Sequence, residues 1–168
     1  MQNSLIKELR SLYSGEGFSG VAFFIIWLYA CFSDDYQQIA RQLHIAIPTI
    51  TLCFILMIGT YFWRLMLRTV IKGEKMNLTS QQKRIFFILK GVSLLLLMMC
   101  SMLLILAMFS QQKYISLSIF LFGFAIIEYI NYFYIRLSYL SPREFRELLR
   151  HRRLRQSHLN RLLHKKNS

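Results

Sequence analysis

Four blocks of apolar residues, separated by short polar stretches, constrain this chain more than any other feature. They cover about residues 18–32, 45–63, 85–109 and 114–135. A bilayer core of about 30 Å needs roughly 20 apolar residues in a helix that rises about 1.5 Å per residue. Only helices and closed barrels satisfy every backbone hydrogen bond within lipid. The blocks therefore predict an all-α membrane protein with four transmembrane helices.

The first block is shorter than a full crossing requires, so flanking residues or a thin local bilayer must extend it. Two alternatives remain open for this block. It could be a re-entrant or buried helix, or, because Lys7 and Arg10 precede it, a signal peptide. No small-residue cleavage site follows it. We therefore expect a retained span.

Lysine and arginine are distributed unevenly around the blocks. The chain has 21 of them against 8 acidic residues, a net charge of +13. Two precede the first block, six lie in residues 64–84 and ten follow residue 135, whereas the opposite side has only Arg41 and Lys113. Because positive charge accumulates on the cytoplasmic side of membrane proteins, this distribution predicts that both termini are cytoplasmic.

The segments outside the blocks divide the chain into three parts. Residues 1–17 are predicted to form an N-terminal amphipathic helix that Gly15 and Gly17 end, either lying on the inner leaflet or packing against neighbouring subunits. Residues 18–140 are the four-span region, with a cytoplasmic loop at 64–84. Residues 141–168 are a basic cytoplasmic helical tail, with Ser141 as its cap.

Local signals predict where the helices begin and end. The second span should continue through Ile71 and stop at Gly73, with Pro48 in its first turn, where proline is tolerated. Thr79 and Gln82 have the spacing of a capping box that starts the third span.

The tail helix carries an apolar stripe that needs a partner surface. Its members are Phe145, Leu148, Leu149, Leu159, Leu162 and Leu163. The cytoplasmic part of one subunit is too small to bury this stripe well, so other subunits, a partner protein or the bilayer surface must cover it. No aromatic residue follows Phe145, and we therefore expect the tail to attract anionic lipid and to contact RNA only weakly, through phosphates.

Three polar residues lie inside the apolar blocks: Lys90, Glu128 and Asn131. Charged groups at such positions usually face the interior of a bundle or a water path. Folding the third and fourth spans as a hairpin places Lys90 opposite about Phe133, roughly 7.5 Å along the axis from Glu128. An ion pair between Lys90 and Glu128 is one interpretation, and a lysine that extends alone toward the interface is the other.

Signatures of enzymes are mostly absent. The sequence has no zinc-protease, serine-hydrolase or P-loop motif, and Cys31, Cys53 and Cys100 lie in three different blocks. We therefore expect no catalytic residues, no metal and no cofactor. Small multidrug transporters also have four spans, but they use a carboxylate in the first span, and the first block here has none.

One nuclease-like spacing occurs twice in the tail. Arg146–His151 and Arg153–His158 both have four residues between the arginine and the histidine, which resembles the Arg-x4–6-His motif of HEPN ribonucleases. That family often has Asn, Asp or His after the arginine, where this chain has Glu147 and Leu154. These residues are candidates either for RNA cleavage or for a solvated, RNA-facing basic helix.

The combination of several spans, a basic tail and a degraded Arg-x4-His element resembles the accessory membrane protein of type VI-B CRISPR systems. The resemblance implies a ring-shaped homo-oligomer that forms a pore in the bacterial inner membrane. It also implies an RNA-guided, RNA-cutting effector as functional partner and a role in antiphage defence. A membrane anchor with a recruiting tail and a membrane-bound ribonuclease are the alternative functions.

Overall fold

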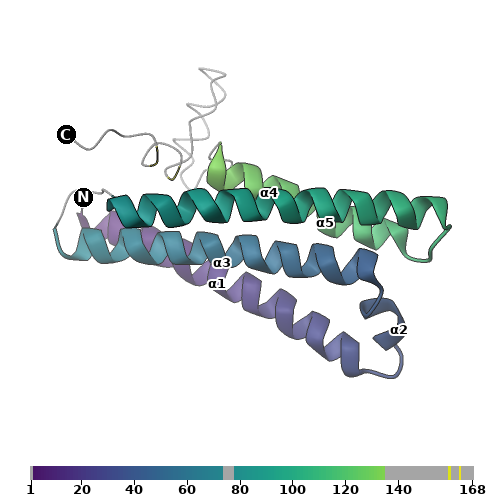
Figure 1. Ribbon diagram of the computed structural model, residues 1–168. Coiled ribbons are helices and arrows are strands. Elements are labelled where there is room, and N and C mark those ends of the chain that lie inside the picture. Colours follow the sequence, from purple (N-terminus) through teal and green to yellow (C-terminus); the bar gives the residue numbers. More distant parts are fainter. Residues whose placement is uncertain (1, 74–77, 135–158, 160–162, 164–168) are drawn as a thin grey trace, which may run out of the picture.

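The computed structural model describes residues 2–73 and 78–134, together with the two leucines at 159 and 163. Within these residues the chain is helical and contains no strand. The helices are α1 (Gln2–Phe32), α2 (Gln37–Ala40), α3 (Leu43–Ile71), α4 (Ser80–Phe109) and α5 (Ile115–Phe133), as Figure 1 shows. All except α2 are long and apolar enough to cross a membrane. The prediction of four spans is confirmed to that extent.

Helix α3 is the centre of the bundle. It packs against α1, α4 and α5, and 67% of its most apolar stretch is buried, compared with 11 to 28% for the other three. Leu52, Ile55 and Phe62 on α3 are almost fully buried. In Figure 1, α1 crosses α3 near the N-terminus and diverges from it toward α2. The other helices are thus arranged around one buried helix.

Large apolar side chains cover the outside of the bundle. Phe18, Phe87 and Phe109 are at least 70% exposed. A water-soluble monomer rarely exposes apolar patches of this extent, whereas lipid chains cover them at no cost. The outer surface is therefore compatible with a multi-pass membrane protein.

The ends of α3 and α4 follow the local sequence signals. α3 continues to Ile71, and Gly73 adopts a φ of +70°, a left-handed conformation that glycine tolerates. Thr79 and Gln82 form the predicted capping box, with distances of 3.0 Å and 3.3 Å between side chain and backbone. These predictions are confirmed. Pro48 lies two residues further into its helix than expected, because α3 already begins at Leu43.

The predicted break at Gly15 and Gly17 is wrong. α1 is one helix of 31 residues, and its apolar span begins at Ile6. Glycine in a helix costs about 1 kcal/mol relative to alanine, but packing can offset this cost. A Cβ at Gly17 would lie 3.3 Å from Thr60, and one at Gly20 would lie 3.4 Å from Leu56. Both glycines therefore allow α1 to approach α3, and the expected boundary after residue 17 falls inside α1.

Hydrogen bonds connect the helices at the α2 end. Arg41 donates from Nε and Nη2 to the carbonyl of Cys31, at 3.1 Å and 2.8 Å. Trp27 donates to the carbonyl of Ala40 at 3.1 Å. These contacts attach the last turn of α1 to the short helix α2 and hold the chain reversal before α3.

Candidate functional site

A polar cavity lies between α1 and α5, with α3 as its floor. Its volume is about 240 Å³. It is lined by Ser11, Leu12, Gly15, Glu16, Ser19, Leu56, Phe124, Glu128, Asn131 and Tyr132. Two carboxylates in one cavity of an apolar bundle are unusual, because charged groups inside a membrane span are costly. We therefore treat this cavity as the candidate site.

Glu16 enters the cavity from α1 and is held by α3 and α5. Its Oε1 accepts a hydrogen bond from the Trp63 indole at 2.8 Å. Its Oε2 is buried without a hydrogen-bond partner among the described residues and lies beside the Tyr132 ring. A Cβ at Gly59 would lie 2.5 Å from Oε2 and would overlap the Tyr132 ring. The absence of a side chain at Gly59 thus makes room for this arrangement.

Glu128 enters the same cavity from α5. Asn131 donates to its Oε2 at 3.4 Å, and Tyr132 lines the cavity beside it. Asn131 and Tyr132 follow Glu128 by three and four residues, so the three side chains share one face of α5. That face points toward α1 and α3, because Tyr132 is 4% exposed and reaches Glu16.

Tyr132 therefore lies between two carboxyl groups. Its hydroxyl carries one hydrogen and can donate it to only one of them at a time. Glu16, Glu128 and the Tyr132 hydroxyl thus line one cavity, a grouping of proton-binding side chains that is rare inside an apolar bundle.

The site lies deep in the bundle as measured from the α2 end. Glu16 precedes the end of α1 by 16 residues, and Glu128 follows Tyr114 by 14 residues. At about 1.5 Å per residue, these separations correspond to about 24 Å and 21 Å along the helix axes. In an apolar layer of about 30 Å that starts at the α2 end, both carboxyl groups lie in the far third.

Lys90 does not join this cluster. Its ammonium group lies 4.2 Å from the centre of the Tyr134 ring, a cation–π contact. The predicted hairpin register, with Lys90 opposite about Phe133, is therefore right to within a residue. The interpretation of an ion pair with Glu128 is not supported, however, since no contact within the described residues joins Lys90 to Glu128. The ring of Tyr134 is nearer to Lys90, and Glu128 faces α1 instead of α4.

Three residues of the site were not identified from the sequence: Glu16, Trp63 and Tyr132. The expected break at Gly15 and Gly17 placed Glu16 outside the membrane region, and the statement that the first span has no acid is wrong. A signal was available, because Leu9, Leu12 and Glu16 lie on one face of an uninterrupted helix. Trp63 and Tyr132 are 47 and 116 residues from Glu16, so no local pattern joins them.

Most of the predicted tail residues lie outside the described residues. These are Phe145, Arg146, Leu148, Leu149, His151, Arg153, His158 and Leu162. Leu159 is described, is 2% exposed and belongs to the hydrophobic core, and Leu163 packs against that core. At least one residue of the predicted stripe is thus covered by the chain itself.

The described residues contain no group of three metal-ligating side chains, and Cys31, Cys53 and Cys100 are free thiols. Comparisons with protein-family models, with curated proteins and with solved structures gave no match. The function therefore has to be argued from the residues of the site.

Proposed function

We propose that the chain assembles into a homo-oligomeric membrane pore that permeabilises or depolarises the bacterial inner membrane. The observation that carries this proposal is the polar cavity with Glu16, Tyr132 and Glu128 inside an otherwise apolar bundle. Intramembrane acids typically mark the paths of ions or protons. A purely structural span gains nothing from burying two carboxyl groups beside each other.

One copy of the chain cannot enclose a water-filled path, because its core is filled by the side chains of α3. The polar cavity instead opens between α1 and α5. Ser11 and Gly15 are exposed on α1 next to the cavity, and nothing lies within 4 Å of a Cβ at Gly15. Small residues allow helices of neighbouring copies to approach closely. In the proposed ring, α1 and α5 face the pore or the adjacent copy.

The cellular role follows from the resemblance in the sequence. We propose that the pore serves RNA-targeting CRISPR antiphage defence as an accessory of the RNA-guided effector. Its N- and C-termini would be cytoplasmic, in line with the uneven distribution of Lys and Arg. The basic tail would then be on the same side of the membrane as the effector and its RNA target.

Two measurements test this function. The mass of the full chain in detergent should correspond to several copies, and a membrane-potential dye should report depolarisation when cells express the chain with an active effector and a matching RNA. Cells with a non-matching RNA are the control. A monomeric mass together with unchanged potential would contradict the pore and favour the alternative, a membrane anchor whose basic tail recruits protein, RNA or anionic lipid.

A further inference from the structure

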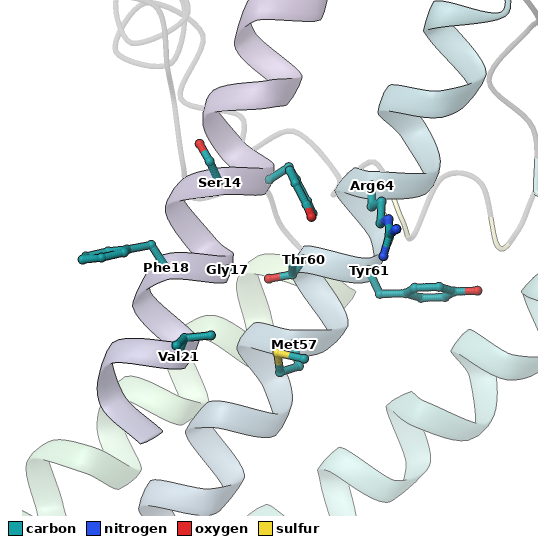
Figure 2. Close-up of a pocket in the computed structure, with 9 residues that line it drawn as sticks. Ser14, Gly17, Phe18, Val21, Met57, Thr60, Tyr61 and Arg64 are labelled. Atoms are coloured by element: carbon teal, nitrogen blue, oxygen red, sulfur yellow. The ribbon is translucent and has the colours of Figure 1, made fainter. Parts of the chain in front are cut away.

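A second cavity lies between α1 and α3, on the other side of α1 from the carboxyl groups, and Figure 2 shows it in close-up. Its volume is about 430 Å³. It is lined by Tyr13, Ser14, Gly17, Phe18, Val21, Met57, Thr60, Tyr61 and Arg64. Nothing in the proposed pore function requires this cavity.

The polarity of the cavity changes along the helix axes. Arg64, Thr60 and Ser14 supply a positive charge and two hydroxyl groups toward the N-terminal end of the bundle. Val21 and Met57 lie on opposite sides of the apolar part and face each other in Figure 2. Met57 precedes Arg64 by seven residues, so the apolar part begins about 10 Å deeper. A phospholipid has the same order, with a phosphate at the interface and acyl chains below it.

No acidic side chain lines this cavity among the described residues, and Arg64 is exposed at its rim. A guanidinium group at the membrane interface attracts negative charge, and basic recesses between spans are typical sites for anionic head groups. Arginine also matches the geometry of a phosphate, because two of its N–H groups can bind two oxygens. The charge of the rim therefore favours an anionic occupant over a zwitterionic one.

We propose that this cavity binds one anionic phospholipid, with the phosphate at Arg64 and an acyl chain along Val21 and Met57. Thr60 donates its hydroxyl hydrogen to the carbonyl of Leu56, and the Tyr61 ring packs against Phe86 on α4, so Arg64 is the donor at the head group. Gly17 keeps the floor open, because a Cβ there would already lie 3.3 Å from Thr60. Bound lipid would join α1 to α3 at the level of the carboxyl cluster and stabilise the arrangement of the two helices.

The test is native mass spectrometry of the full chain in detergent with phosphatidylglycerol and, separately, with phosphatidylcholine of identical acyl chains. We expect retention of phosphatidylglycerol and about tenfold weaker binding by Arg64→Gln, as loss of one charge-assisted contact predicts. Arg68→Gln is the matched control, because Arg68 lies one turn further along α3 and does not line the cavity. It should retain wild-type affinity.

Met57→Trp tests the apolar part independently. The larger side chain fills the space of the acyl chain, so binding of phosphatidylglycerol should fall. In a separate experiment, inorganic phosphate should not displace phosphatidylglycerol from the wild-type protein. Three results would overturn the proposal. They are equal affinity for both lipids, an equal loss in Arg64→Gln and Arg68→Gln, and displacement of the lipid by inorganic phosphate at equal concentration.

Discussion

Helices α1 and α5 flank two cavities of opposite character. The cavity near α2 has a volume of about 540 Å³ and is lined almost entirely by apolar side chains, including Trp27, Ile39 and Phe120. The smaller cavity contains both carboxyl groups. Phe23 and Phe124 separate the two, with ring centres 5.8 Å apart in an edge-to-face contact.

The difference between these cavities supports the choice of the smaller one as the candidate site. Lipid chains can fill an apolar recess in a membrane bundle, so the larger cavity requires no special chemistry. Burying polar groups without partners costs several kcal/mol. The smaller cavity gathers polar neighbours for its acids from α3 and α5, and Gly59 is left without a side chain so that they fit.

The largest effect is expected at Gly59. In Gly59→Ala the new methyl group would overlap Tyr132 and Glu16, and overpacking of this kind costs about 1–3 kcal/mol. Thermal unfolding in detergent should show a clear decrease in stability. Gly123→Ala on α5 is the control, because nothing lies within 4 Å of its Cβ, and it should be neutral or slightly stabilising. Equal behaviour of the two variants would show that the site is not tightly packed.

Substitution of Trp63 and Trp27 compares the two cavities directly. Trp63→Phe removes a donor to a carboxyl group, at a cost of about 1.5–3 kcal/mol, whereas Trp27→Phe removes a bond to a neutral carbonyl, at a cost of about 1 kcal/mol. Unfolding measurements should therefore rank Trp63→Phe as the more destabilising variant. The reverse order would mean that the Glu16 carboxyl group does not depend on Trp63.

The aromatic pair between the cavities should be coupled. In a double-mutant cycle of Phe23→Ala and Phe124→Ala, the interaction energy should be about 0.5–1.5 kcal/mol. In the proposed pore, Phe124→Ala also connects the two cavities and should increase ion leakage into liposomes. Additive stability effects would show that the rings do not form a barrier.

The smallest effect concerns Lys90. Lys90→Met should lose only the contact with Tyr134, which is worth about 0.5–1 kcal/mol. Lys90→Met and Glu128→Gln should be additive to within about 0.5 kcal/mol, because the two residues share no contact. A coupling larger than this in unfolding experiments would restore the ion pair that the hairpin register had suggested.

The sequence predicted the parts of the fold that depend on local signals. The length of the apolar blocks predicted the four spans, Gly73 predicted the end of α3, and Thr79 predicted the start of α4. Counting residues along the hairpin also placed Lys90 of α4 opposite the end of α5, where it contacts Tyr134. Register along the axis does not determine which way a side chain points around the helix, and Glu128 points toward α1.

The remaining errors arise from packing between distant segments. Gly15 and Gly17 have the local chemistry of a helix end, but the contact of α1 with α3 overrides it, as tertiary contacts commonly override propensity. Glu16 then falls inside the first span. Its neighbours in the site come from α3 and α5. The repeat of apolar residues every 3.6 positions shows which face of one helix is buried, but not which distant helix covers that face.

We propose that the carboxyl groups of Glu16 and Glu128 lie on the ion path of an oligomeric pore. The most direct measurement is ion flux from liposomes that contain the purified full chain or its Glu16→Gln, Glu128→Gln variant, with Asp35→Asn at the α2 end as control. We expect flux through the wild-type and control proteins, and a loss of at least about tenfold in the double variant. Equal flux through all three proteins, or no flux through the wild type, would contradict the account.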